Sequence, residues 1–203
     1  MKAKDDYILK NPIRIVCVGR LINAKNPINI IKAVAKIDNI ELTLIGNGKL
    51  YERLIQFTRK LNLLGSKVKF IQKLNNDRLC EILKDFDIFV ASNHYSGISK
   101  ALIEALLVGL PCIHNKIKKF DNPELNSNSM LLVDDTEVSY RDAIQGLINN
   151  DIQRRHLGES GRKFANRKFL PKEKEQEHAS VYINMLKGSA LSIQHLPESA
   201  ERK

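Results

Sequence analysis

Two basic side chains in the segment GRLINAK, residues 19–25, have types and spacing suited to holding a diphosphate. Arg20 provides a planar fork of donors and Lys25 a compact point charge, and both kinds of cation recognise phosphate groups. Gly19, just before them, allows the chain to turn tightly. The plain alternative is a solvated loop that carries two cations, and this loop alone leaves both interpretations open.

A carboxylate occupies an unusual place further along the chain. Glu104 is the only charged residue in the apolar helical stretch 101–110. A helix that is apolar all round is buried, and a buried lone carboxylate is costly unless something donates hydrogen bonds to it. The vicinal diol of a ribose offers two such donors. A buried salt bridge to an Arg or Lys is the alternative.

Three weaker candidates lie in other loops. Gly97, Ile98 and Ser99 precede the same helix, whose free N–H groups favour an anion, although Ser99 is also a fair N-cap. The Gly46–Gly48 turn (GNG) either lets the backbone approach a ligand or is an ordinary turn. Lys73 lies in a segment that either frames a base or is a plain connector.

Histidines and further lysines give little sign of chemistry. His94 and His114 each end an apolar run, and no carboxylate or cysteine stands at metal-ligand spacing from them. We interpret them as hydrogen-bonded polar residues of loops, and we expect no metal. Lys116, Lys118 and Lys119 form a small basic cluster that is either solvated or faces an anionic membrane surface.

The elements that must position these residues alternate along the chain. Continuous apolar runs of four to six residues predict buried parallel strands, and stretches with apolar residues at helical spacing separate them. The predicted strands are residues 13–18, 40–45, 68–71, 87–91, 111–114 and 130–133. The predicted helices are residues 27–37, 49–63, 76–84, 99–108, 137–149, 151–168 and 171–186.

This alternation predicts an α/β, doubly wound, Rossmann-like domain with a parallel sheet of about six strands and a helical C-terminal extension. Ligands of such domains bind at the carboxyl ends of the strands, where the candidate loops lie. The length of 203 residues suits one domain over residues 12–187. Residues 1–11 are predicted to be linker-like, and residues 188–203 to form a disordered tail.

Composition narrows the class of protein. Cys17, Cys80 and Cys112 are odd in number and widely spaced, which favours reduced thiols in a cytoplasmic protein. The amino terminus lacks the apolar core of a signal peptide, and no apolar run reaches the length of a membrane span. The net charge of +10 favours anionic partners or merely solubility. Because basic residues are spread out without interleaved aromatics, nucleic acid is not an expected partner.

Five motifs occur in a characteristic order between residues 13 and 168: GRLxxxK, LTLIGNG, VKFIQ, DIFVAS and SGISKALIEALLVGLP. This set resembles the C-terminal, donor-binding domain of the retaining glycosyltransferases with the GT-B fold, known as family 4 or group 1. The last motif is the most specific of the five. The resemblance implies an enzyme that transfers a sugar from a UDP- or GDP-linked donor to a hydroxyl, with retained anomeric configuration.

The resemblance also implies roles for particular residues. Arg20 and Lys25 would act in catalysis by neutralising the charge that develops on the leaving nucleoside diphosphate, so that neither a metal nor another cofactor is needed. Glu104 would accept hydrogen bonds from the ribose hydroxyls. The remaining residues implied to bind the nucleotide sugar are Gly19, Lys73, Ser96, Gly97, Ile98 and Ser99.

Two positions depart from the family pattern. Ser96 stands where the family usually has a second Glu, eight residues before the ribose-binding one. That carboxylate lies near the donor hexose, so the donor and the rate of transfer stay open. Gln72 stands where a Gly usually follows the third strand.

A GT-B enzyme has a second, N-terminal domain that carries the acceptor site, and these 203 residues do not supply one. We therefore expect an excised domain, a truncated frame or one subunit of a split enzyme, inactive alone. The expected partners are a nucleotide-sugar donor, a glycan or glycolipid acceptor, and an N-terminal GT-B domain or subunit. The expected setting is surface polysaccharide or lipopolysaccharide synthesis, in the cytoplasm or at the inner face of the cell membrane.

Two alternatives differ in class. One is a non-catalytic remnant that binds a nucleotide or only stabilises a partner. The other is an unrelated dinucleotide-dependent oxidoreductase, which requires GxGxxG after the first strand. Residues 19–25 read GRLINAK there, which argues against the oxidoreductase.

Overall fold

The computed structural model describes residues 3–95, 97–117, 125 and 128–169 of the chain. The chain divides into two compact units, residues 1–166 and 167–203, and the fold below is that of the first unit. Ser96, Lys118 and Lys119 lie outside the described residues, as do the predicted helix 171–186 and the predicted tail.

The centre of the first unit is a parallel sheet with the strand order β3-β2-β1-β4-β5-β6. The prediction of a doubly wound sheet of about six parallel strands is confirmed. The order reverses between β1 and β4, which places the loops after these two strands next to each other at the carboxyl edge. The strands are β1 (Ile13–Val18), β2 (Ile40–Ile45), β3 (Val68–Ile71), β4 (Ile88–Ala91), β5 (Cys112–Asn115) and β6 (Leu131–Val133).

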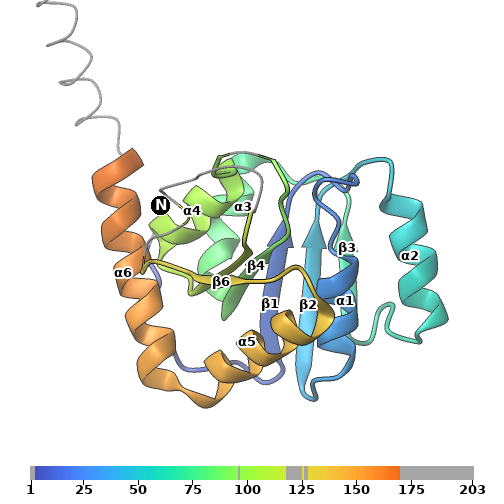
Figure 1. The fold of residues 1–203 in the computed structure, drawn as a ribbon, viewed down its shortest axis with the longest axis horizontal. Helices are drawn as coiled ribbons and strands as arrows, with labels where there is room; N and C mark the ends of the chain where they lie inside the picture. Colours follow the sequence, from blue (N-terminus) through green and yellow to red (C-terminus); the bar gives the residue numbers. More distant parts are fainter. Residues whose placement is uncertain (1–2, 96, 118–124, 126–127, 170–203) are drawn as a thin grey trace, which may run out of the picture. The chain divides into compact units, whose positions relative to one another are not determined.

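Helices cover both faces of this sheet, with α1 and α5 on one face and α3 and α4 on the other (Figure 1). Their bounds lie within a few residues of the predicted ones, and the third predicted helix ends in a short 3-10 turn, η1. The helices are α1 (Ile28–Ala35), α2 (Tyr51–Lys60), α3 (Asn76–Ile82), η1 (Leu83–Asp85), α4 (Lys100–Val108), α5 (Glu137–Asn149) and α6 (Asp151–Phe169).

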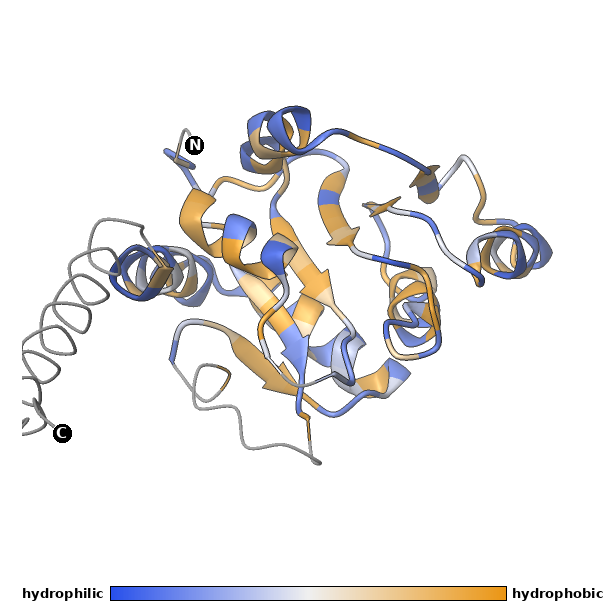
Figure 2. Ribbon diagram, turned by 90° about the horizontal axis from the view of Figure 1, so that it is seen from above, coloured by the Kyte–Doolittle hydropathy of each residue, from blue (hydrophilic) through white to orange (hydrophobic). Residues whose placement is uncertain are grey.

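The core follows from the hydropathy of these elements. Apolar residues fill β1, β2 and β4, while the helices present an apolar face inward and a polar face outward (Figure 2). On α1 the inward residues include Ile30, Ile31 and Val34, which are fully buried against the sheet. A sheet covered on both faces needs continuous apolar strands, which is why the sequence runs were informative.

Local capping fixes where helices start and stop. Asn75, Ser99 and Thr136 each accept a hydrogen bond from the backbone N–H three residues on, at the first turns of α3, α4 and α5. Gly109 ends α4 with a left-handed φ of 92°, a conformation that favours glycine. The end of α4 is thereby fixed before β5 begins.

The amino-terminal segment packs against the first unit. Tyr7 is buried and donates from its hydroxyl to the carbonyl of Gly109 at 3.1 Å. The carbonyl of Tyr7 accepts from Nε of Arg154, itself buried, at 2.9 Å. Residues 1–11, expected to be linker-like, thus include a residue held between α4 and α6.

Candidate functional site

A pocket opens at the carboxyl ends of β1 and β4, where the strand order reverses. It brings together four of the residues singled out from sequence, Gly19, Arg20, Lys25 and Ser99, although they come from two distant segments. The other residues that line it are Cys17, Val18, Leu21, Pro27, Ala91, Ser92 and Asn93. This is the place at which doubly wound domains bind their ligands.

The two cations of the pocket lack acidic partners. Arg20 is exposed and Lys25 is half-buried, and among the described residues no carboxylate forms an ion pair with either. Burial, and then the charge of Arg20, lower the pKa of Lys25 below its ordinary value. Because the free protein disfavours this positive charge, an anion in the pocket is favoured.

The loop that carries these cations is built tightly. The N–H of Lys25 donates to the carbonyl of Ile22 at 2.8 Å, which closes a turn between the two residues. The buried side chain of Leu21 anchors the loop to the core. The turn and the buried Leu21 therefore hold the backbone of Arg20 and Lys25 in place. Their side chains can still change conformation.

The glycine turn after β2 supports this loop from the side. A Cβ added to Gly46 would lie 2.0 Å from the carbonyl oxygen of Gly19, and one on Gly48 would lie 2.4 Å from that of Leu21. The N–H of Leu21 donates to the carbonyl of Asn47 at 2.9 Å. The glycines thus allow two loops of the chain to lie in close contact. The sequence alone could not tell this role from close approach to a ligand.

The start of α4 supplies the other side of the pocket. Ser99 lines the pocket and its hydroxyl oxygen accepts from the N–H of Leu102 at 3.3 Å, which is the N-cap role considered above. Gly97 has a φ of 86°, in the left-handed region that suits glycine. Gly97 and Ile98 stand next to the pocket in sequence but are not part of its lining.

Glu104 is buried as predicted, with 5% of its surface exposed. Its Oε1 lies 3.6 Å from Nζ of Lys100, one turn earlier on α4. The salt bridge left open as an alternative is therefore present. The side chain of Lys100 is 75% exposed, and an ion pair with such a mobile partner is weak. A carboxylate can accept several hydrogen bonds, so Glu104 can accept more than the single contact with Lys100 provides.

Of the other described candidates, Glu104 and Lys73 do not line this pocket. Lys73 is exposed in the segment after β3, and β2 separates β3 from β1 in the sheet. Ser96 belongs to the part of the chain that the structure does not describe.

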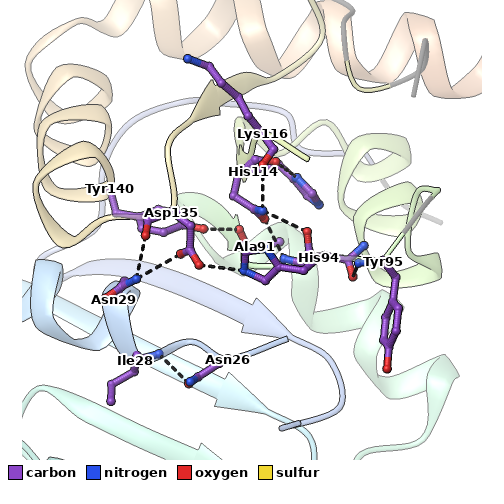
Figure 3. Close-up of polar contacts among 12 residues, drawn as sticks. Asn26, Ile28, Asn29, Ala91, His94, Tyr95, His114, Lys116, Asp135 and Tyr140 are labelled. Atoms are coloured by element: carbon purple, nitrogen blue, oxygen red, sulfur yellow. Dashed lines mark hydrogen bonds and ion pairs between the residues drawn. The ribbon is translucent and has the colours of Figure 1, made fainter. Parts of the chain in front are cut away.

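His94 is a hydrogen-bonded loop residue, as interpreted from the sequence, and the structure adds its partner. Its Nε2 lies 2.8 Å from Oδ2 of Asp135, a carboxylate 41 residues further along the chain (Figure 3). Asn29 on α1 donates to the carbonyl and to Oδ1 of the same Asp135. A search for partners at short spacing could not find this pair, because tertiary structure brings the two loops together.

His114 is different from the expectation of a loop residue. It belongs to β5, is fully buried, and its Nδ1 lies 2.7 Å from the carbonyl of Asn115, which can only accept (Figure 3). Nε2 is therefore an acceptor, and it has no partner among the described residues. Burial, and to a smaller extent the charge of Lys25, lower the pKa of His114, so the imidazole is neutral.

Residues 2–164 match the profile of the family described as glycosyl transferases group 1. The chain belongs to this family. Its structure is a C-terminal-like domain of the GT-B glycosyltransferases, as the resemblance of its motifs implied. The strands, the pocket and the five motifs all fall within the matched residues. Of the described helices, only α6 extends a few residues beyond them.

Individual members of this group extend the comparison. An uncharacterized glycosyltransferase of Methanocaldococcus jannaschii is 28% identical over 192 residues, which cover 91% of this chain and 48% of that protein. A capsular polysaccharide biosynthesis glycosyltransferase of Staphylococcus aureus is 25% identical over 194 residues, which cover 93% and 50%. The chain therefore spans about half the length of these curated relatives.

A solved structure shares the fold. The Anabaena protein HepE, crystallised with UDP and glucose, superimposes with a TM-score of 0.75 and is 17% identical, over 85% of this chain and 48% of that one. Within the described part of the chain, no helix combines the length and the apolar character needed to cross a bilayer. The same residues hold no group of three or more His, Cys, Asp and Glu side chains placed to bind a metal ion.

Proposed function

We propose that this chain binds the nucleoside diphosphate part of a sugar donor and is the donor-binding domain of a retaining glycosyltransferase. The observation that carries this proposal is that Arg20 and Lys25 lie together in the pocket at the strand reversal, with no acidic partner among the described residues. Two like charges this close destabilise each other until an anion joins them. A diphosphate is such an anion.

The residues around the pocket take distinct parts in this binding. Arg20 pairs with phosphate oxygens through its fork, and Lys25 places a point charge beside them. The first turn of α4, next to Ser99, offers the positive end of a helix dipole. As the bond to the sugar breaks, negative charge grows on the leaving diphosphate, and these positive groups stabilise it.

Glu104 accepts from the ribose hydroxyls in this scheme. The weak pair with Lys100 holds the buried carboxylate in the free protein, and the exposed lysine side chain swings away without loss of packing. A diol then replaces one long ion pair by two hydrogen bonds to a charged acceptor. Such bonds are among the stronger ones in proteins.

The donor is a UDP- or GDP-linked sugar, and the acceptor is a hydroxyl of a glycan or glycolipid. The Anabaena structure with UDP and glucose favours UDP as the first nucleotide to test. The capsular relative favours a place in surface polysaccharide synthesis. A domain or subunit of the kind that completes a GT-B enzyme supplies the acceptor site, since the chain spans about half of its relatives.

A non-catalytic nucleotide-binding protein is the second candidate. It uses the same pocket and the same residues, but it transfers no sugar. Ser96, where the family usually has a carboxylate, leaves the donor sugar and the rate of transfer open, but its hydroxyl can still hydrogen-bond, and it is not by itself a sign of lost function. The two functions predict equal nucleotide binding and differ only in turnover once a completing domain is present.

Isothermal titration calorimetry with UDP and GDP tests the shared binding step. We expect wild type to bind one of them at millimolar concentration or below, and Glu104→Ala to bind about 10-fold or more weakly, since a hydrogen bond to a charged group is worth roughly 1.5–3 kcal/mol. Glu81→Ala is the matched control, because Glu81 is an exposed helix glutamate paired with Arg78 at 2.8 Å. No binding of either nucleotide by wild type disproves the proposal, and equal affinity of wild type and Glu104→Ala disproves the ribose role.

A further inference from the structure

The side chain of Asn115, at the end of β5, pairs with a backbone rather than with a side chain. Its Oδ1 accepts from the N–H of Asn93 at 2.7 Å, and its Nδ2 donates to the carbonyl of Asn93 at 3.0 Å. The last backbone pair of β4 and β5 joins Ala91 and His114. The amide of Asn115 thus extends the sheet by one more pair, reaching into the loop that follows β4.

The side chain of Asn93 forms hydrogen bonds with later residues of the same loop. Its Oδ1 accepts from the N–H of Tyr95 at 3.2 Å, and its Nδ2 donates to the carbonyl of Gly97 at 3.3 Å. The next residue, His94, donates from its N–H to the carbonyl of Ala24 at 2.8 Å, beside Lys25. The segment before α4 is therefore tied both to the sheet and to the cationic loop.

Asn93 itself lines the pocket, whereas Asn115 is fully buried and does not. We propose that Asn115 is a positioning residue, which sets the affinity of the pocket for a nucleoside diphosphate by holding Asn93 and the start of α4 in place. The inference rests on the proposed function and adds to it a residue that never touches the ligand.

The chemistry of the side chain explains why an amide is needed. Both polar groups of the Asn93 backbone must be satisfied, one by an acceptor and one by a donor, and the carboxamide of Asn carries both side by side on one uncharged planar group. An apolar residue would leave two buried backbone groups unpaired. Nδ2 of Asn115 also donates to the carbonyl of Lys116 at 3.2 Å, so the amide is fully used.

Two variants test the proposal in the 203-residue chain. Asn115→Leu removes both bonds to Asn93, while Asn115→Asp keeps the acceptor and loses the donor. The matched control is Thr58→Val, because Thr58 is equally buried and its hydroxyl donates to the carbonyl of Leu54, on α2. The measurements are the Kd for UDP or GDP, whichever wild type binds, amide hydrogen exchange, and unfolding by urea.

We expect Asn115→Leu to bind the nucleotide at least 10-fold more weakly, and Asn115→Asp about 3-fold or more weakly. The amides of Asn93 and Tyr95 should exchange faster in both, while those of β1 and β2 stay protected. Thr58→Val should lose stability without a change in Kd. A merely structural role of Asn115 would give the Thr58 pattern.

A Kd within twofold of wild type in the folded Asn115 variants overturns the inference. If Asn115→Leu does not fold, Asn115→Asp decides, and if neither folds, Asn115 is a folding residue and the inference is wrong. Failure of wild type to bind removes the proposed function and this inference together. Weaker binding by Glu104→Ala with unchanged binding by the Asn115 variants removes this inference alone.

Discussion

At the scale of single residues, the environment of Lys25 separates function from stability. Burial and Arg20 lower the pKa of Lys25, so folding disfavours its charged form. A lysine in such a place does not add to stability through its charge, which fits the proposed role in binding an anion. Asn115 and Glu104 are also buried polar residues. Each needs hydrogen-bonding partners that an apolar side chain in the same place would not need.

Replacing Lys25 by Met should separate the cost of its charge to stability from its contribution to nucleotide binding. We expect the free energy of unfolding of Lys25→Met at pH 7 to equal or exceed that of wild type, because an unfavourable charge is removed, while affinity for UDP or GDP falls at least 10-fold. A lowered pKa in the folded state also means that wild-type stability gains from Lys25 as pH rises through that pKa towards 10.5, and the variant lacks this gain.

Urea unfolding at pH 7 and pH 10, together with calorimetry, measures both effects. Lys36→Met is the control, because Lys36 is exposed on the surface and paired with Glu137 at 2.6 Å. It should keep nucleotide affinity. Unchanged nucleotide affinity in Lys25→Met would argue against the diphosphate role.

The three thiols should differ in reactivity for a physical reason. Cys17 and Cys112 are buried, and burial raises the pKa of Cys17 to about 12 and that of Cys112 further. The pKa of Cys80 is raised less, by partial burial and by the charge of Glu104. At pH 8 we expect a thiol reagent to modify only Cys80 in the native protein, and all three in urea. Rapid modification of Cys17 in the native state would show that the β1 edge opens.

At the scale of elements, glycines decide how closely helices approach the rest of the chain. Gly158 on α6 faces Tyr7 and Gly109, and a Cβ there would lie 2.3 Å from Cε1 of Tyr7. Gly146 on α5 is exposed, with no atom within 4 Å of such a Cβ. The same residue type is thus required in one helix and costly in the other.

The two helix glycines should therefore respond oppositely to alanine. Gly146→Ala should raise the free energy of unfolding by about 0.5–1 kcal/mol, because alanine is the better helix former. Gly158→Ala should lower it by roughly 1–3 kcal/mol, because the added methyl meets Tyr7 and a carbonyl that cannot both yield. Urea unfolding of both variants measures this, and Gly158→Ala as stable as wild type would contradict the packing of Tyr7 described above.

At the scale of the whole molecule, the first unit presents the pocket proposed to bind the donor at one edge of a doubly wound sheet, in a chain about half the length of its relatives. A donor site by itself holds a nucleotide, whereas transfer also needs an acceptor hydroxyl held against the sugar. The net charge of +10 assists the approach of anionic donors over the whole surface.

We therefore expect the 203-residue chain to bind UDP or GDP without transferring sugar from the corresponding nucleotide sugar. A coupled assay for released nucleotide, with glycan and glycolipid acceptors, checks this against a full-length relative as the positive control. Sugar transfer above the uncatalysed rate by the chain alone would contradict it.

The helices and strands could be predicted from the sequence, because the patterns that indicate them are local. Apolar runs predicted the six strands, Ser99 indicated the start of α4, and the lone Glu104 on an apolar helix indicated a buried carboxylate. Each of these inferences needs only a few neighbouring residues. The motif order then added the family.

Which distant residues contact one another could be learned only from the tertiary structure. The pairs His94 with Asp135 and Asn93 with Asn115 join residues 41 and 22 positions apart, and no periodicity links them. The packing of Tyr7 on Gly109, 102 positions away, has the same origin. Side-chain partners across a sheet edge depend on strand order and register, which local patterns do not encode. The lowered pKa of Lys25 likewise follows from burial in a folded pocket, which a sequence of residue types does not contain.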